Sequence, residues 1–248
     1  MQPFLITTSW DDGHPLDLRV AELVEKYGQT ATFYVPRQYM DDRLSDSEIC
    51  DLAERHEVGS HTLTHPNLPD IDLSEAKREI VDSKTWLEDL TGRPISTFCY
   101  PRGLATPSLR DLVAEAGYGL GRTVETYHLD PGPDLYCLPT TLHLYPYPVR
   151  PITWKAFAAK TLPFRTAWRN RSRLGLSRRA LLNRRHLVRS LLDKAAATGG
   201  VWHLWGHSWE IERYDLWDFL EEILELAASY ETGQSVTNSG ILERYSSP

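Results

Sequence analysis

The sequence predicts a single α/β domain whose parallel strands form a barrel. Short runs of β-branched and aromatic residues alternate about seven times with helical segments, and no internal repeat or low-complexity linker separates them. The length of 248 residues fits one large domain or two small ones, and 41% hydrophobic residues provide for a sizeable core. This composition excludes a disordered chain, a collagen-like repeat and a coiled coil. A barrel-like α/β fold is therefore expected over residues 1–248.

In the first half of the chain, each expected element follows from its local pattern. Strands are expected at residues 4–10, 31–35, 57–60, 96–100 and 118–123. Helices are expected between them, at residues 16–27, 47–55, 74–90 and 107–116. Ser47 and Ser74 are the expected N-caps of two of these helices, and Gly92 lies just beyond the end of the second. The alternation predicts a mainly parallel sheet.

The second half of the chain has fewer clear elements. Prolines and aromatic residues dominate residues 126–151, where only residues 138–145 resemble a strand. A strand is expected at residues 201–205 and a long helix at residues 214–229. Residues 154–194 are expected to form two helices that separate near Gly175, with Ser177 as the cap of the second. Residues 146–198 are therefore interpreted as a helical insertion into the barrel.

Charge is unevenly distributed along the chain. The net charge is −7, yet nine arginines and no acidic residue lie between Arg165 and Leu192, which leaves 18 basic and 34 acidic residues elsewhere. The acidic remainder disfavours a general nucleic-acid binder. Two interpretations of the segment Arg165–Arg189 stay open. It forms a solvated amphipathic helix packed on the barrel, or it contacts an anionic membrane or a phosphate-bearing substrate.

Membrane and secretion signals are absent from the sequence. No stretch approaches the roughly 18 consecutive apolar residues of a membrane span. The N-terminal residues lack the basic start and apolar run of a signal peptide, so a cytoplasmic location is expected. Cys50, Cys99 and Cys137 are too few and too scattered for a disulfide framework, which fits a reducing compartment.

Residues with acid–base or metal-ligand chemistry stand where predicted strands end. They are Asp11, Asp12, His61, His65 and His207. Sites in parallel α/β folds gather at the carboxyl ends of the strands. His61 and His65 would lie on one face if they form a helical turn, and their spacing suits joint metal ligation, although two ordinary polar histidines at a turn are an equal alternative. Two histidines and one carboxylate would leave positions open for water and substrate.

Four segments together resemble the polysaccharide deacetylases of carbohydrate esterase family 4, which contain the NodB-homology domain. The segments are residues 8–13 (TSWDDG), 60–65 (SHTLTH), 98–103 (FCYPRG) and 201–207 (VWHLWGH). Their order and spacing match, and the resemblance covers about residues 4–123 and 200–230. It implies a distorted (β/α)7-type barrel, which agrees with the number of strands expected above.

The resemblance also implies a role for each matching residue. Asp11 would be the general base and His207 the general acid, while Asp12, His61 and His65 would hold one divalent metal ion, usually zinc. Such an ion lowers the pKa of bound water and polarises an amide carbonyl. The implied reaction is removal of an N-acetyl group from an N-acetylated sugar, for which a precursor of a surface polysaccharide is the more natural substrate.

The sequence departs from the family pattern at two places. Cys99 stands where an arginine usually pairs with the catalytic base, and Arg102 stands at a position usually taken by tyrosine. Arg102 either restores a charge near Asp11 or pairs with an acid at the surface. Residues 121–124 offer no clear match to the family's fourth motif. Two alternatives therefore stay open: a hydrolase of a non-sugar amide or cyclic imide, and a non-catalytic carbohydrate-binding relative.

Further residues are candidates for substrate contact. A backbone N–H near Tyr100 could stabilise the oxyanion of the tetrahedral intermediate. A period of two places Trp205 and His207 on one face of the last strand, where Trp205 forms either a wall against a sugar or acyl methyl group, or ordinary core. Glu210 either orients His207 or lies at the surface. His203, on the same face, is expected to be packed against a backbone partner.

Overall fold

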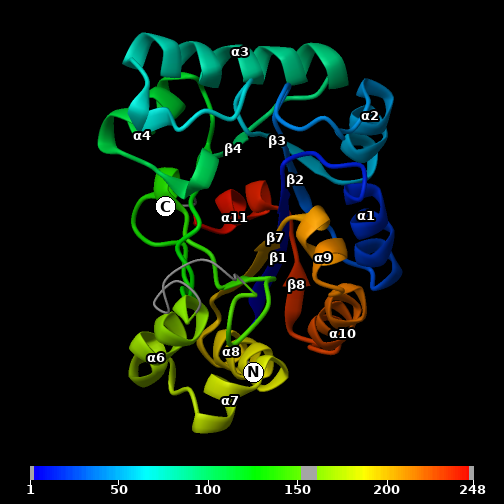
Figure 1. The fold of residues 1–248 in the computed structure, drawn as a ribbon, viewed down its shortest axis with the longest axis vertical. Coiled ribbons are helices and arrows are strands. Elements are labelled where there is room, and N and C mark those ends of the chain that lie inside the picture. Colours follow the sequence, from blue (N-terminus) through cyan, green and yellow to red (C-terminus); the bar gives the residue numbers. More distant parts are fainter. Residues whose placement is uncertain (1–2, 152–160, 246–248) are drawn as a thin grey trace.

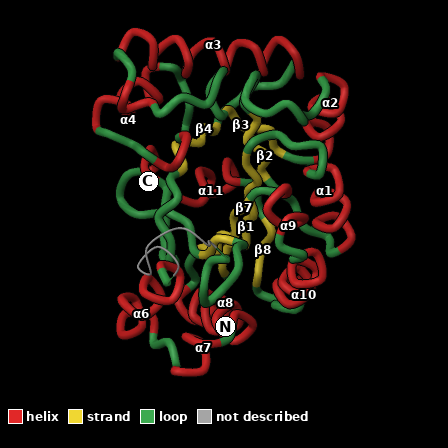
Figure 2. Tube along the Cα trace, viewed as in Figure 1, coloured by secondary structure: helices red, strands yellow, loops and turns green. Residues whose placement is uncertain are grey.

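The computed structural model describes residues 3–151 and 161–245, and its strands form one curled parallel sheet (Figures 1 and 2). The strands are β1 (Phe4–Asp11), β2 (Thr32–Val35), β3 (Glu57–Ser60), β4 (Thr97–Cys99), β5 (Leu120–Arg122), β6 (Leu142–His143), β7 (Val201–Gly206) and β8 (Gly233–Ser235). Their order is β5-β4-β3-β2-β1-β7-β6, with β8 paired to the start of β1, and every pairing is parallel.

One segment links the two edges of this sheet. Leu138 forms a parallel bridge with Arg122 of β5, and four residues later Leu142 pairs with Leu204 of β7. The chain between these points therefore connects the first strand of the order to the last. The expected barrel-type α/β fold is confirmed. The strand expected at residues 138–145 shortens to β6, and Pro139 is one cause, since proline has no N–H to donate to a ladder.

Helices surround the strands on the outside (Figure 2). In chain order the outer helices of the first half are α1 (Asp17–Lys26), α2 (Asp46–Arg55), α3 (Leu73–Thr91) and α4 (Pro107–Glu115), and those of the second half include α8 (Arg184–Thr198), α9 (Ser208–Arg213) and α10 (Trp217–Ala228). Strand β1 is buried on both faces: Ile6 and Trp10 belong to the main core, whereas Ser9 hydrogen-bonds the His203 ring at 2.8 Å. His203 is buried, as expected, and besides the Ser9 side chain the backbone of Pro139 also interacts with its ring.

The amino end of the barrel is closed by α11 (Asn238–Tyr245), which lies near the centre of the view in Figure 1. A separate core cluster joins Ile241 of this helix to Leu5, Leu120 and Val201, the residues at or near the starts of β1, β5 and β7. Burying these side chains stabilises the closure. The opposite end, where the strands finish, is consequently the end available for a site.

Two of the expected helix caps are wrong by two residues. Ser45, and not Ser47, caps α2, because Glu48 lies three residues after Ser45 and completes a capping box with it. Asp72, and not Ser74, is the N-cap residue of α3. Gly92 does end α3, with a φ of 65° that glycine adopts readily. The caps shift because several polar residues precede each helix, and only one has the extended backbone of an N-cap.

The arginine-rich segment forms α6 (Leu162–Leu174) and α7 (Arg178–Leu182) and then continues into α8. Gly175 ends α6 and Ser177 caps α7, as expected. A third helix arises because Asn183 has an extended backbone and caps α8 with its side chain. The start of the helix expected from residue 154 lies outside the described residues. The long helix expected at 214–229 is shorter, since α10 begins at Trp217. Within residues 3–151 and 161–245, no helix has the length and apolar character that crossing a membrane requires.

Candidate active site

The structure brings the five predicted residues Asp11, Asp12, His61, His65 and His207 together at the carboxyl end of the barrel. Asp11 is the last residue of β1, His61 directly follows β3, and His207 directly follows β7. The Nε2 atoms of His61 and His65 lie 3.8 and 3.7 Å from Oδ1 of Asp12. The Nε2 atom of His207 lies 3.8 Å from the other oxygen, Oδ2.

The backbone around this site is unusual. Of the six described non-glycine residues with positive φ, four surround it: Asp12 (82°), Thr62 (69°), His65 (55°) and Arg102 (59°). Such conformations cost free energy and persist where the surrounding structure holds them. The helical turn considered for residues 61–65 is therefore wrong, and the two histidines converge through a loop instead.

Glu79 of α3 holds that loop in place. Its carboxylate accepts hydrogen bonds from the backbone N–H groups of Leu63 at 2.8 Å and Thr64 at 2.9 Å. It also accepts one from the hydroxyl of Thr64 at 2.8 Å. Because these bonds satisfy the turn between the two histidines, the loop needs no helical hydrogen bonds. His61 and His65 thus lie close together as their spacing predicted, but they are held by a loop and not by a helical turn.

The donor atoms of Asp12, His61 and His65 fit a divalent metal ion. One ligand atom from each lies within 4.8 Å of the others. Nδ1 of His61 donates to the backbone carbonyl of Cys99 at 2.7 Å, which leaves the lone pair of Nε2 free for an ion. Burial lowers the pKa of both histidines, that of His65 to about 3, so both rings are neutral, as metal ligation requires. Tyr39 stacks on the His65 ring, with centroids 3.9 Å apart.

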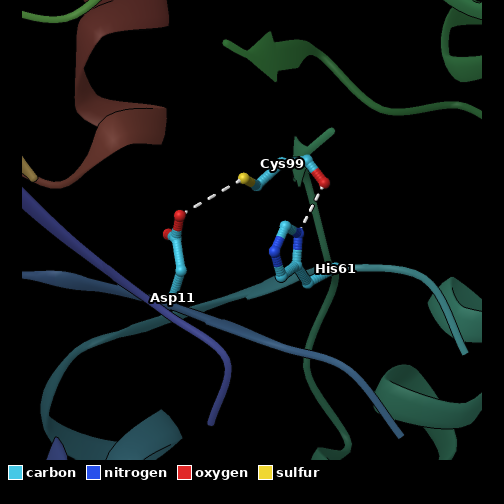
Figure 3. A group of neighbouring side chains, drawn as sticks. All are labelled: Asp11, His61 and Cys99. Carbon is cyan, nitrogen blue, oxygen red and sulfur yellow. Dashed lines mark hydrogen bonds between the residues drawn. The ribbon is translucent and has the colours of Figure 1, made fainter. Parts of the chain in front are cut away.

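A second possible ligand set, Asp11, His61 and Cys99, fits less well (Figure 3). Burial raises the pKa of the Cys99 thiol well above its usual range, so the sulfur is protonated and points toward Asp11 at 3.8 Å. The carbonyl of the same residue orients His61, as Figure 3 shows. Cys99 therefore acts through its backbone, and the sequence's expectation of an inert buried cysteine agrees with its environment.

Asp11 is paired with Arg122, and not with Arg102. The fully buried guanidinium of Arg122 donates to Oδ1 of Asp11. Burial by itself would raise the pKa of Asp11, but the charge and hydrogen bond of Arg122, together with the charges of His61 and His207, outweigh burial and lower the pKa, so the carboxylate is ionised. Arg102 is exposed, and within the described parts of the chain it forms no ion pair. The suggestion that Arg102 restores the charge at Asp11 is therefore wrong.

The register of the sheet explains this exchange. Cys99 of β4 lies directly opposite Arg122 of β5 in the parallel ladder. The arginine that the family pattern places at position 99 is thus supplied by the neighbouring strand at the same height. Sequence reasoning missed Arg122, although a lone arginine in an otherwise apolar strand was a usable signal, because buried arginine needs a partner.

On the far side of Asp12, His207 belongs to a hydrogen-bonded group. Its Nδ1 atom donates to Oε2 of Glu210 at 2.6 Å, and Nε2 of His143 donates to the same oxygen at 3.2 Å. Burial opposes a charge on His207, yet the bond to Glu210 and the charge of Asp12 raise its pKa to about 9. Burial likewise opposes ionisation of Glu210, but its two histidine partners lower its pKa to about 2. His207 consequently carries a proton at neutral pH.

Three aromatic residues complete the surroundings. Trp205 is 6% exposed and lies between the stacked His143 ring, 3.9 Å away, and the guanidinium of Arg122, 5.0 Å away. Trp209, for which the sequence favoured ordinary core packing, donates its Nε1–H to Oδ2 of Asp12 at 3.0 Å. The N–H of Tyr100 donates to the carbonyl of Arg122 at 3.1 Å, so Tyr100 itself does not supply the expected oxyanion donor.

Comparison with solved structures defines the class of fold. A crystal structure from Mycobacterium smegmatis, assigned as a polysaccharide deacetylase, superposes with a TM-score of 0.67 at 15% identity and covers 98% of this chain and 90% of its own. A family 4 acetyl xylan esterase from Clostridium thermocellum, solved with a cobalt ion, gives a TM-score of 0.58 at 16% identity and covers 98% and 93%. At these identities the likeness establishes the shared barrel fold alone.

Sequence comparison then identifies the family. Residues 2–121 match the polysaccharide deacetylase family model, which confirms the recognition made from the motifs. A chitooligosaccharide deacetylase of Azorhizobium caulinodans is 30% identical over 115 residues, which are 45% of this chain and 54% of the relative. Residues 2–121 are therefore similar to the polysaccharide deacetylase family, and the match spans about half the length of that curated relative.

Proposed function

We propose that this protein is a metal-dependent deacetylase that hydrolyses the acetyl amide of an N-acetylated sugar, including a precursor of a surface polysaccharide. The observation that carries the proposal is the convergence of Asp12, His61 and His65, with free ring nitrogens, between an ionised Asp11 and a protonated His207. The chitooligosaccharide deacetylases that this chain resembles support an N-acetylated sugar as the substrate class.

In the proposed mechanism Asp12, His61 and His65 hold one divalent ion, and we propose zinc, because two imidazoles and a carboxylate are a common zinc ligand set. When bound, such an ion supplies a Lewis acid for the amide carbonyl and a water of lowered pKa. Asp11 forms an ion pair with Arg122 and is not one of the three proposed metal ligands. Its other carboxylate oxygen, Oδ2, has only the Cys99 thiol as a weak donor at 3.8 Å, so it can take the proton of the attacking water as that water adds to the carbonyl carbon.

His207 acts on the opposite bond. The amide nitrogen is a poor leaving group until it is protonated, so the C–N bond breaks only if an acid delivers a proton to it. Glu210 binds Nδ1 of His207, which leaves the Nε2–H free on the side of Asp12. Transfer of that proton as the C–N bond breaks yields acetate and the free amine of the sugar. Asp11 then releases its proton to solvent and the imidazole takes one up, which restores both groups for the next turnover.

Release of acetate from defined substrates tests this function. We expect the zinc-loaded protein to release acetate from N-acetylchitooligosaccharides, and to do so faster than from acetylated xylan, because the protonated His207 chiefly assists an amine leaving group. A panel of non-sugar amides and cyclic imides should give no comparable turnover. Hydrolysis of an imide without acetate release from any N-acetylated sugar would replace the proposed substrate class. The absence of turnover on both panels would favour a carbohydrate-binding role.

A further inference from the structure

A cavity of about 300 Å³ lies beside the active site, between the β6–β7 edge of the barrel and the arginine-rich insertion. His143 and Trp205 line it, and their rings separate it from the His207 ring, with centroid distances of 5.8 and 5.5 Å to that ring. The cavity therefore adjoins the active site, with these two rings between them.

The walls of this cavity are largely apolar. Described lining residues include Leu144 after β6, Leu187 and Val188 of α8, and Phe219 of α10. Neither an aspartate nor a glutamate lines the described part of the cavity, and its neutral polar groups belong mainly to two threonines, three tyrosines and His143. A second sugar ring carries hydroxyl groups that need hydrogen-bond partners when they are buried, so these walls suit an apolar group better.

Two arginines, Arg150 and Arg184, also line the cavity. Neither has a carboxylate within 4.0 Å among the described residues, whereas Arg185, the next residue along, forms two hydrogen bonds of 2.5 Å with Glu222. The Nε atom of Arg150 is buried without a hydrogen-bond partner in the described structure. Two positive charges in an apolar cavity thus lack the acids that normally accompany them.

Aromatic rings hold these two guanidinium groups. Arg150 lies over the Tyr145 ring at 5.1 Å, and Arg184 lies over the Phe219 ring at 4.0 Å. A guanidinium stacked by its face on a ring keeps its N–H groups free at its edge, where they match the oxygens of a phosphate. Burial and the charge of Arg185 lower the pKa of Arg184, and the charge of Glu222, which is paired with Arg185, offsets this only in part.

We propose that this cavity binds a phosphate group esterified to an apolar chain, as part of a substrate whose N-acetylated sugar occupies the metal site. The phosphate pairs with Arg150 and Arg184, and the chain packs on the aliphatic and aromatic walls. This inference rests on the proposed function, because it defines the substrate class of the same site. It also narrows the expected contact of Arg165–Arg189 with a phosphate-bearing substrate to one arginine of that segment, Arg184.

Calorimetric titration of the zinc-loaded protein with geranyl phosphate tests the proposal without any need for turnover. Geranyl phosphate should bind at least about tenfold more tightly than inorganic phosphate or geraniol. It alone has both a phosphate to pair with the two arginines and an apolar chain to pack on the cavity walls. Arg150→Gln and Arg184→Gln should each weaken binding by about tenfold, the usual effect of one charge-assisted hydrogen bond. The matched control Arg178→Gln changes an exposed arginine that does not line the cavity, and it should bind as the unaltered protein does.

A metal ion can itself bind phosphate, so His65→Ala serves as the second control. It should weaken the metal site yet leave geranyl phosphate binding in place. Binding that disappears in His65→Ala but persists in Arg150→Gln and Arg184→Gln would overturn the proposal, as would no binding at all. Tighter binding of uridine diphosphate than of geranyl phosphate would contradict the proposal that the phosphate carries an apolar chain.

If sugars are deacetylated but geranyl phosphate does not bind, only the present inference fails. If geranyl phosphate binds but no sugar is deacetylated, the proposed function fails instead.

Discussion

Asp12, His61 and His65 come from two short segments that follow β1 and β3, whereas the group around His207 is assembled from distant parts of the chain. His143 and Glu210, for example, lie 67 residues apart in sequence and share one hydrogen bond. The first side of the site depends on strand ends and tight loops, which short motifs encode. The second side depends on tertiary contacts between β6, β7 and α9. Substitutions on the two sides should therefore impair the protein in different ways.

The largest expected effects separate metal binding from proton transfer. Asp11→Asn removes a base and His207→Ala removes an acid, and neither change removes a proposed metal ligand. Each should lower kcat by about 100- to 10,000-fold, the usual range for general acid–base roles, while the bound metal stays. Steady-state kinetics on an N-acetylchitooligosaccharide, with metal analysis of the same samples, gives both numbers. Near-normal activity in either variant would assign that role to another residue.

The next effect concerns the buried pair of Asp11 and Arg122. Arg122→Met leaves the carboxylate of Asp11 buried without its counter-charge, so the free energy of unfolding should fall by about 3–5 kcal/mol. Chemical denaturation measures this loss. The double variant Asp11→Asn, Arg122→Met removes both charges and should recover much of the stability. If the double variant is as unstable as Arg122→Met alone, the ion pair is not the cause.

A smaller effect is expected at His143, which we infer to be a positioning residue for Glu210 and His207. His143→Phe keeps a ring that can stack on Trp205 but removes the N–H donor to Glu210. Loss of one hydrogen bond should lower kcat by about tenfold. KM for an N-acetylchitooligosaccharide should stay unchanged, because this substrate carries no phosphate or apolar chain for the cavity that His143 lines, and His143 does not touch the metal ligands. A rise in KM at constant kcat would instead place His143 in substrate binding.

The smallest effect concerns Asp17, a buried carboxyl group that accepts from Ser208 but has no cationic partner in the described structure. Burial raises its pKa well above the usual range. The folded state therefore holds this proton more tightly than the unfolded state, and stability falls as pH rises from the unfolded pKa toward the folded one. Asp17→Asn should stabilise the protein by on the order of 1 kcal/mol at pH 8 and by less at pH 4. Equal effects at both pH values would contradict this account.

The sequence predicted the barrel because its strand–helix alternation is local, and it predicted that Asp11, Asp12, His61, His65 and His207 converge because strand ends meet in such folds. The choice of Asp12, His61 and His65 as metal ligands came from the family resemblance. It did not predict α11 or β8, whose short segments carry little periodicity. It also missed Arg122, because the partner of Asp11 depends on which residue faces Cys99 across the β4–β5 ladder. Register between strands is a tertiary property that one sequence does not display.

The metal content of two variants tests the central claim most directly. If Asp12, His61 and His65 hold the ion and Asp11 does not, elemental analysis of the unaltered protein and of Asp11→Asn should each give about one zinc per chain. The double variant His61→Ala, His65→Ala should retain almost none. Full zinc occupancy in that double variant, or loss of the ion from Asp11→Asn in a folded protein, would contradict the assignment.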